Sequence, residues 1–209
     1  MTKLYYCYDA LCGWCYGFSP VMTQFYAKYR AEVDLEVISG GMITGPRIGP
    51  IGEVAPYIKS AHKVVEDRCG VKFGSAFLDG VLEEGSTVFT SIPPAIALSV
   101  VKDKSPTNAL DYAAQLQTAI YYDGIDPSDL NAYAVRAEKY GLDRDKFVAA
   151  MQEERYTAAA EADFATSARF GVTGFPTLVA GVGERYVALT RGYTDLAALE
   201  QNFTQAKRM

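Results

Sequence analysis

The stretch "ALCGWCYGF" (residues 10–18) places two cysteines, Cys12 and Cys15, only two residues apart. The preceding run "KLYYCY" (residues 3–8) is rich in aromatic side chains and predicts a short buried strand. In the following run, residues 15–30, apolar side chains recur every three or four positions, which predicts a helix. The two cysteines therefore lie where a strand passes into a helix. There they could hold a metal, staple the fold, or exchange electrons with other thiols.

Residues 33–39, "VDLEVIS", alternate apolar and acidic side chains and end at Gly40-Gly41, which predicts a second strand. Strand, helix and strand within about 40 residues form a βαβ unit with a right-handed crossover. Residues 46–156 show helix signals and little strand signal, so we expect four to six helices there. Asp126 is the expected N-cap of one of these helices and Asp143 the N-cap of the next.

The strand pattern returns near the C-terminus. Residues 176–182 and 185–192 predict a hairpin that turns at Gly183 and Glu184. A terminal helix follows, capped by Thr194 or Asp195. The fold class is therefore α/β, with a large all-α insertion between a βαβ half and a ββα half. We expect residues 1–45 and 157–209 to form one domain and residues 46–156 to be inserted in it.

Composition excludes several classes of function. The net charge is −5 and no basic run is present, so we expect no nucleic-acid partner. No apolar stretch approaches the roughly 18 residues of a membrane span, and the N-terminal residues do not resemble a secretory signal. We therefore expect no membrane partner and a cytoplasmic location. Thiols in that compartment are normally reduced, which disfavours a permanent disulfide.

The position of Cys12 favours thiol chemistry. The first turn of a helix presents unpaired N–H groups and the positive end of the helix dipole, and both stabilise a thiolate. Cys15 lies one turn later on the same helix face. It could therefore attack a mixed disulfide formed on Cys12, as a resolving thiol must.

A second motif lies far along the chain, "GVTGFPT" at residues 171–177. Pro176 cannot donate a hydrogen bond to a strand ladder, so it must begin a strand or occupy a special turn. A cis bond between Phe175 and Pro176 would be a deliberate feature, because only about 5–6% of such bonds are cis.

Taken together, these motifs resemble the thioredoxin superfamily and specifically its DsbA-like branch. The resemblance extends over nearly the whole chain, including residues 121–151 and 165–177. It implies that Cys12 attacks, Cys15 resolves, Pro176 is cis, and the backbone of Phe175 pairs with an extended substrate. It also implies a protein disulfide oxidoreductase that needs no organic cofactor or metal. Its partners would be protein thiols or disulfides, or glutathione as a co-substrate.

The dipeptide between the cysteines departs from the best-known members of that family. It is Gly13-Trp14, with no histidine to stabilise the thiolate. We therefore expect a reduction potential between about −270 and −180 mV. Trp14 and Phe18 are expected either to form an apolar rim that helps to bind substrate chains or to belong to the core.

Two acidic residues are candidate proton relays to the dithiol, Asp9 and Glu36. Asp9, three residues before Cys12, could instead cap the turn between strand and helix. Its charge would oppose a thiolate on Cys12, which favours the capping role. Glu36 could equally lie on a solvated strand face.

Three alternatives use the same residues differently. The spacing of Cys7, Cys12, Cys15 and Cys69 formally fits a plant-type iron–sulfur site, although Cys7 lies in a predicted strand. A zinc site is equally disfavoured, since His62 is the only histidine. A glutathione-dependent isomerase or kappa-class transferase, such as 2-hydroxychromene-2-carboxylate isomerase, would share the fold. Those enzymes typically carry serine where Cys12 stands. The sequence leaves open the direction of electron flow, the substrate and the oligomeric state.

Overall fold

The computed structural model describes residues 1–183 and 185–208. Its central sheet has four strands in the order β2-β1-β5-β6. The first strand, β1 (Thr2–Tyr8), runs parallel to β2 (Val33–Ser39). Helix α1 (Gly13–Tyr29) connects the two strands, so the predicted βαβ unit is confirmed.

The C-terminal half completes the sheet. Strand β5 (Thr177–Val182) runs antiparallel to β1 and to β6 (Arg185–Arg191), and α9 (Leu196–Ala206) follows. The hairpin turn expected at Gly183 and Glu184 includes Glu184, which lies outside the described residues. The two central strands, β1 and β5, thus come from opposite ends of the chain.

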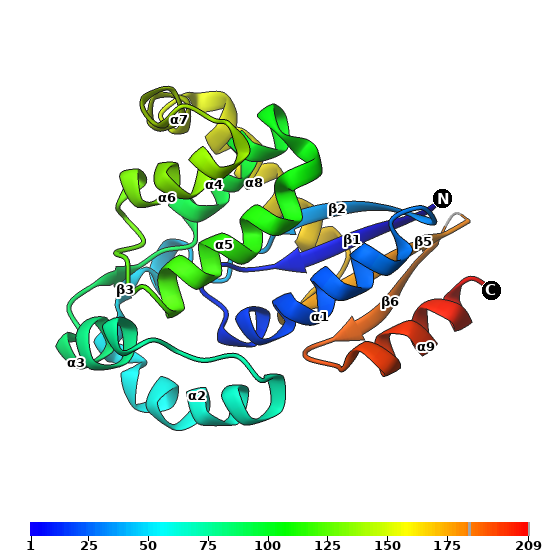
Figure 1. Ribbon diagram of the computed structural model, residues 1–209, viewed down its shortest axis with the longest axis horizontal. Helices are drawn as coiled ribbons and strands as arrows, with labels where there is room; N and C mark the ends of the chain where they lie inside the picture. The colour runs from blue at the N-terminus through cyan, green and yellow to red at the C-terminus, as the bar shows by residue number, and fades with distance from the viewer. Residues whose placement is uncertain (184, 209) are drawn as a thin grey trace.

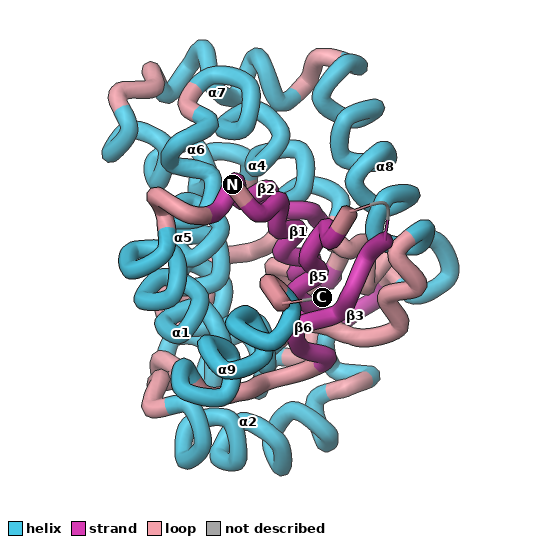
Figure 2. The backbone as a smooth tube through the Cα atoms, turned by 90° about the vertical axis from the view of Figure 1, so that its right-hand side faces the viewer, coloured by secondary structure: helices cyan, strands magenta, loops and turns pink. Residues whose placement is uncertain are grey.

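Helices cover both faces of the sheet. Helices α1 and α9 lie on one face, and α8 (Glu154–Arg169) lies on the other (Figures 1 and 2). The first face is held by aromatic packing: the ring of Phe25 meets that of Phe203 edge to face at 5.3 Å, and Tyr6 packs against Phe18 at 5.9 Å. Burial of such large apolar rings is the main favourable contribution to folding here.

The insertion lies beyond one end of the sheet, at the left of Figure 1. Its helices are α2 (Ala55–Cys69), α3 (Leu82–Glu84), α4 (Ile92–Lys104), α5 (Ala109–Tyr121), α6 (Leu130–Ala137) and α7 (Arg144–Met151). It also contains a small ladder between β3 (Gly49–Pro50) and β4 (Val88–Phe89), so it is helical apart from these two short strands. The expected boundary between residues 156 and 157 falls inside α8.

Two of the expected helix caps are confirmed and one is wrong. The side chains of Asp143 and Asp195 accept hydrogen bonds from backbone N–H groups at the starts of α7 and α9. Asp126, however, accepts from Ser128 in a turn, and Asp129 caps α6 instead. The hydroxyl of Tyr133 donates to the carbonyl of Pro127 at 2.8 Å, which helps to hold Pro127 in the turn outside the helix.

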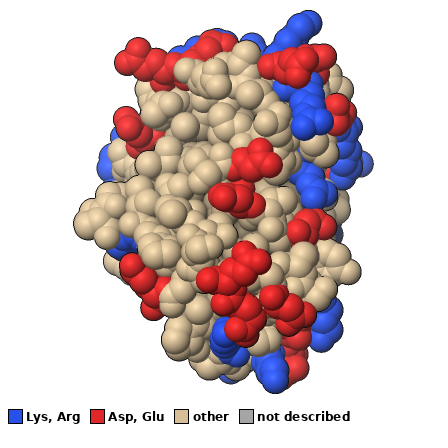
Figure 3. Space-filling model, turned by 90° about the vertical axis from the view of Figure 1, so that its left-hand side faces the viewer, with Lys and Arg blue, Asp and Glu red and all other residues tan. Residues whose placement is uncertain are grey.

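Charged side chains are unevenly spread over the face drawn in Figure 3. The face drawn in Figure 3 carries acidic side chains and a broad uncharged area, and no continuous basic stripe crosses it. Within residues 1–183 and 185–208, no helix combines the length and apolar character needed to cross a membrane.

Candidate active site

Cys12 occupies the N-cap position of α1, one residue before the helix begins. Its backbone N–H donates to the carbonyl of Asp9 at 3.1 Å, and its own carbonyl accepts from Tyr16 at 3.1 Å. Its side chain makes no capping hydrogen bond. The thiol instead donates to the carbonyl oxygen of Phe175, with Sγ and O 3.5 Å apart. The structure thus brings together two motifs that are 163 residues apart.

Cys15 lies in the first turn of α1 and is wholly buried, whereas Cys12 keeps 7% of its surface exposed. Burial raises the pKa of Cys15 well above its usual range, and a hydrogen bond with Cys12 acts in the same direction. Both cysteines are free thiols. The two cysteines are therefore unequal in burial, and the pKa of Cys15 is raised.

The segment of residues 171–176, here called the Pro176 loop, is fixed beside Cys12. Its Phe175–Pro176 peptide bond is cis. The Thr177 hydroxyl donates to the carbonyl of Gly174 at 2.8 Å, and the N–H of Gly192 donates to the carbonyl of Pro176 at 2.7 Å. The start of β5 and the end of β6 thus hold the loop from one side, while Cys12 meets it from the other.

A hollow of about 240 Å³ adjoins the Pro176 loop. One basic residue, Arg191 at the end of β6, is among the residues that line it. The lining residues are Thr173, Gly174, Phe175, Thr177, Arg191 and Gly192. This hollow is large enough to take part of an extended peptide or of a small thiol.

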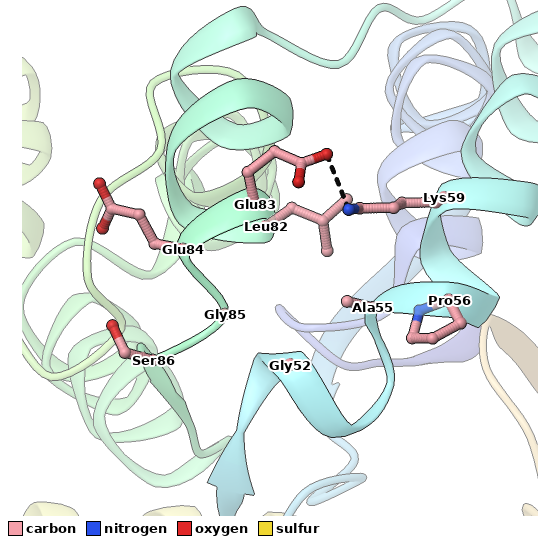
Figure 4. Close-up of a pocket in the computed structure, with 9 residues that line it drawn as sticks. All are labelled: Gly52, Ala55, Pro56, Lys59, Leu82, Glu83, Glu84, Gly85 and Ser86. Carbon is pink, nitrogen blue, oxygen red and sulfur yellow. Dashed lines mark ion pairs between the residues drawn. The ribbon is translucent and has the colours of Figure 1, made fainter.

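A larger hollow, of about 510 Å³, lies between α2 and α3. Figure 4 shows the ion pair between Lys59 and Glu83, 2.7 Å long, that crosses it. No cysteine, histidine or residue of the Pro176 loop lines it. Neither hollow is lined by a cysteine, and the smaller one is lined by the Pro176 loop, whose Phe175 carbonyl contacts the Cys12 thiol.

Asp9 is buried at the turn between β1 and α1, with only 2% of its surface exposed. Its carboxylate accepts hydrogen bonds from the N–H of Leu11 at 3.0 Å, the N–H of Met42 at 2.7 Å and the hydroxyl of Ser91 at 2.9 Å. Burial raises the pKa of Asp9, and the bonds from Met42, Leu11 and Ser91 oppose that rise. The charge of Asp9 also contributes to the high pKa of Cys15. The residue thus both caps the turn and lies beside the buried thiol.

Ser91, just before α4, is a residue that the sequence analysis missed. Its hydroxyl donates to Asp9 and accepts from the N–H of Ile43 at 2.9 Å, and its own N–H donates to the carbonyl of Ile43 at 2.8 Å. It joins the insertion to the loop that follows β2. No local pattern identifies it, because Ser91 and Asp9 are 82 residues apart.

Glu36 does not lie beside the dithiol in the structure. It pairs with Tyr5 in the sheet, and its carboxylate contacts Lys3 at 3.4 Å and Lys102 at 3.9 Å. The side chains of Tyr5 and Cys7 point to the face covered by α8, whereas that of Tyr6 points towards α1. Glu36 is therefore on the sheet face opposite α1.

The other cysteines do not join Cys12 and Cys15. Cys7 is wholly buried in β1, and burial raises its pKa to about 12. Cys69 ends α2 and faces α1 at Gly17, where an added Cβ would lie 2.6 Å from its sulfur. In the described part of the chain, no group of three or more cysteine, histidine or acidic side chains is arranged to hold a metal. The iron–sulfur spacing is therefore not matched by a cluster in space.

The two aromatic residues near the dithiol have different positions. Phe18 is wholly buried and belongs to the core. Trp14 is half-buried, and its ring centre lies 6.2 Å from that of Tyr193. Only Trp14 remains as a candidate for the apolar rim.

A strand-helix junction that carries Cys12 and Cys15 beside a cis-proline loop, within a βαβ and ββα sheet, defines the thioredoxin class of folds. The family model "DSBA-like thioredoxin domain" matches residues 90–203, more than half of the chain. The chain therefore belongs to this family. The matched region contains Pro176 but not the dithiol.

Three solved structures cover nearly the whole chain. One, from Nitrosomonas europaea, is described as a candidate protein disulfide isomerase; it is 25% identical, with 99% of this chain and 98% of that one covered and a TM-score of 0.88. The cytosolic disulfide reductase DsbM from Pseudomonas aeruginosa is 26% identical, with 99% and 100% covered and a TM-score of 0.82. DsbM has also been solved with glutathione.

A more distant structure is that of a 2-hydroxychromene-2-carboxylate isomerase, with 16% identity, 99% and 96% coverage and a TM-score of 0.69. At this identity the likeness concerns the fold alone. No curated protein sequence matches the chain.

Proposed function

We propose that the protein is a thiol–disulfide oxidoreductase that works through the Cys12–Cys15 pair. The observation that carries the proposal is the contact between the Cys12 thiol and the carbonyl of Phe175, which places this sulfur beside a backbone able to hold a substrate strand. The similarity to DsbM, a disulfide reductase, supports the same class of reaction.

The environments of the two sulfurs assign their roles. Cys12 is the proposed nucleophile, because it is the less buried of the two cysteines and lies at the N-cap of α1, where the positive end of a helix dipole favours a negative charge. Cys15 is the resolving thiol, since burial keeps it protonated until a mixed disulfide forms beside it. Asp9 exchanges the proton with Cys15, because it is the buried acid next to that thiol, whereas Glu36 faces away.

In the reductive direction, the Cys12 thiolate attacks one sulfur of a substrate disulfide. The Cys12–substrate S–S bond forms, the substrate S–S bond breaks, and the departing thiolate takes up a proton. Cys15 then gives its proton to Asp9 and attacks the Cys12 sulfur, which releases the second substrate thiol. Two electrons pass from the dithiol to the substrate, and two glutathione molecules restore the dithiol by forming glutathione disulfide.

The hollow beside Phe175 suits a thiol that carries a carboxylate. Arg191 supplies a cation there, and the Phe175 backbone supplies hydrogen-bonding groups. Glutathione and extended protein segments both meet this description, and the complex of DsbM with glutathione supports the first. We propose a cytoplasmic location for this chain on the same analogy, since DsbM is described as cytosolic.

The test is redox equilibration against glutathione buffers, followed through the fluorescence of Trp14, the single tryptophan. We expect a two-electron transition between about −270 and −180 mV. Cys12→Ser and Cys15→Ser should each abolish it. Cys69→Ser is the matched control and should leave the midpoint unchanged, because Cys69 lies outside the dithiol.

Two outcomes would contradict the proposal. A transition that persists in Cys12→Ser would place the chemistry elsewhere. Glutathione binding without any transition, with activity on a small molecule surviving Cys15→Ser, would indicate a glutathione-dependent isomerase or transferase instead.

A further inference from the structure

The loop that follows β2 meets the Pro176 loop at a glycine that the proposed reaction does not itself use. An added Cβ on Gly40 would overlap the Cε1 and Cζ atoms of the Phe175 ring. We propose that Gly40 is a positioning residue, which seats the Phe175 ring and so fixes the Phe175 backbone against Cys12. This inference rests on the proposed thiol–disulfide exchange and extends it to a residue outside both motifs.

Gly40 cannot yield easily to a larger side chain, because its backbone is held. Its N–H donates to the carbonyl of Tyr8, the last residue of β1, at 2.7 Å. Two residues later the N–H of Met42 is bound by Asp9, and Ile43 is bound by Ser91. A side chain at position 40 would therefore displace the Phe175 ring rather than the loop that carries Gly40.

The neighbouring Gly41 has the same relation to a second ring. It adopts a positive φ of 68°, which favours glycine, and an added Cβ would lie 2.8 Å from Cγ of Phe164 on α8. The diglycine at the end of β2 thus admits one ring from the Pro176 loop and another from α8. This close approach explains why two residues without side chains follow the strand.

The contacts form a closed path around the nucleophile. The Cys12 N–H binds the carbonyl of Asp9, the Asp9 carboxylate binds the loop after β2, Gly40 seats the ring of Phe175, and the carbonyl of Phe175 accepts from the Cys12 thiol. The position of the Phe175 backbone relative to Cys12 therefore depends on Gly40. A displacement of about 1 Å in a reacting assembly can cost about 100-fold in rate.

The experiment compares Gly40→Ala with and without Phe175→Ala. We expect Gly40→Ala to lower kcat/KM for disulfide reduction at least tenfold. In the Phe175→Ala background, the same change should cost less than threefold, because the ring that it would strike is gone. Gly80→Ala is the matched control: no atom lies within 4 Å of the added Cβ, and activity should be unchanged.

Equal losses in the two backgrounds, or no loss in either, would overturn the proposal. If Gly40→Ala does not fold, the double variant with Phe175→Ala decides between the explanations. A folded double variant would support the clash with the Phe175 ring as the cause, and an unfolded one would overturn the proposal. A second readout does not need disulfide exchange. The rate at which iodoacetamide modifies Cys12, measured by mass spectrometry, should rise at least threefold in Gly40→Ala and be unaffected by the same change when Phe175 is alanine.

This readout separates the two proposals. A wild-type protein without exchange activity, but with the expected change in Cys12 modification, would remove the proposed function and keep the role of Gly40. If the wild type is active but Gly40→Ala changes neither activity nor the modification of Cys12, the proposed function stands and the role of Gly40 is overturned.

Discussion

The two faces of β1 each bury a thiol near a carboxylate, and only one of the two pairs adjoins the proposed redox dithiol. Towards α1, Cys15 lies near Asp9 and beside a second thiol, Cys12. Towards α8, Cys7 lies near Asp163, with the hydroxyl of Ser167 as its hydrogen-bonding partner. Cys12, the thiol next to the first pair, keeps 7% of its surface exposed, whereas Cys7 is wholly buried.

The two carboxylates also differ in their partners. Asp163 receives the Lys102 ammonium at 2.8 and 2.9 Å, so its charge is neutralised by a cation that opposes the rise of its pKa on burial. Asp9 receives only neutral donors. Burial raises the pKa of both carboxylates and hydrogen bonds oppose that rise in both, so the two differ in that only Asp163 has a bound cation. A buried thiol beside a carboxylate is therefore not sufficient for a redox site.

The largest difference between the two faces should appear in thiol reactivity. With iodoacetamide at pH 8, we expect Cys12 to react at least 100-fold faster than Cys7. A thiol with a pKa of about 12, as burial gives Cys7, is ionised to about one part in 10⁴ at that pH. Its rate should rise about tenfold per pH unit for as long as the fold persists, because the thiolate is the reactive form.

Peptide mass spectrometry would measure both rates in one sample. Modification in guanidinium chloride is the control, since all four cysteines should then react at similar rates. Comparable rates for Cys7 and Cys12 in the folded protein would contradict the distinction between the two faces.

The next effect concerns the charged pair under α8. Lys102→Met should lower the free energy of unfolding by about 3 kcal/mol, because it leaves the Asp163 carboxylate buried without its cation. Lys104→Met removes only the exposed pair with Asp103, which solvent screens, and should change the free energy of unfolding much less. Urea denaturation would measure both changes. An equal cost for the two variants would mean that the buried pair contributes no more than a surface one.

The smallest effect concerns the neutral donors of Asp9. Ser91→Ala removes one of its hydrogen bonds and should lower the free energy of unfolding by about 1–2 kcal/mol. It should also lower exchange activity, since the loop that seats Phe175 loses an anchor. Ser60→Ala, on the exposed face of α2, should change stability by less than about 0.5 kcal/mol. If the Ser91→Ala protein is less stable but fully active, the hydrogen bonds of Ser91 support the fold and are not needed for exchange.

The sequence predicted those parts of the fold and site that local patterns encode. The order of strands and helices follows from periodicity, and Cys12 and Cys15 stand out by their spacing at a strand-helix junction. The helix caps at Asp143 and Asp195 could also be predicted, because each depends only on neighbouring residues. At Asp126 and Asp129 two competent caps lie three residues apart, and the bond between Tyr133 and Pro127 favours the second.

The remaining features depend on contacts between distant segments. Nothing near Ser91 in the sequence indicates that its hydroxyl binds Asp9, and nothing near Gly40 indicates that a ring from the Pro176 loop lies over it. The placement of Glu36 depended on which face of β2 it occupies, and the sheet register decided that. Such residues are identified only when the chain is folded.

The distance along the chain between Cys12 and Phe175 has a consequence for synthesis. A ribosome that adds about 5–20 residues per second advances the 163 positions from Cys12 to Phe175 in about 8–33 seconds. Throughout that interval the newborn dithiol has neither the loop that shields it nor the strand β5 that completes its sheet. The nascent protein thus emerges with its most reactive sulfur first and the structure that controls that sulfur last.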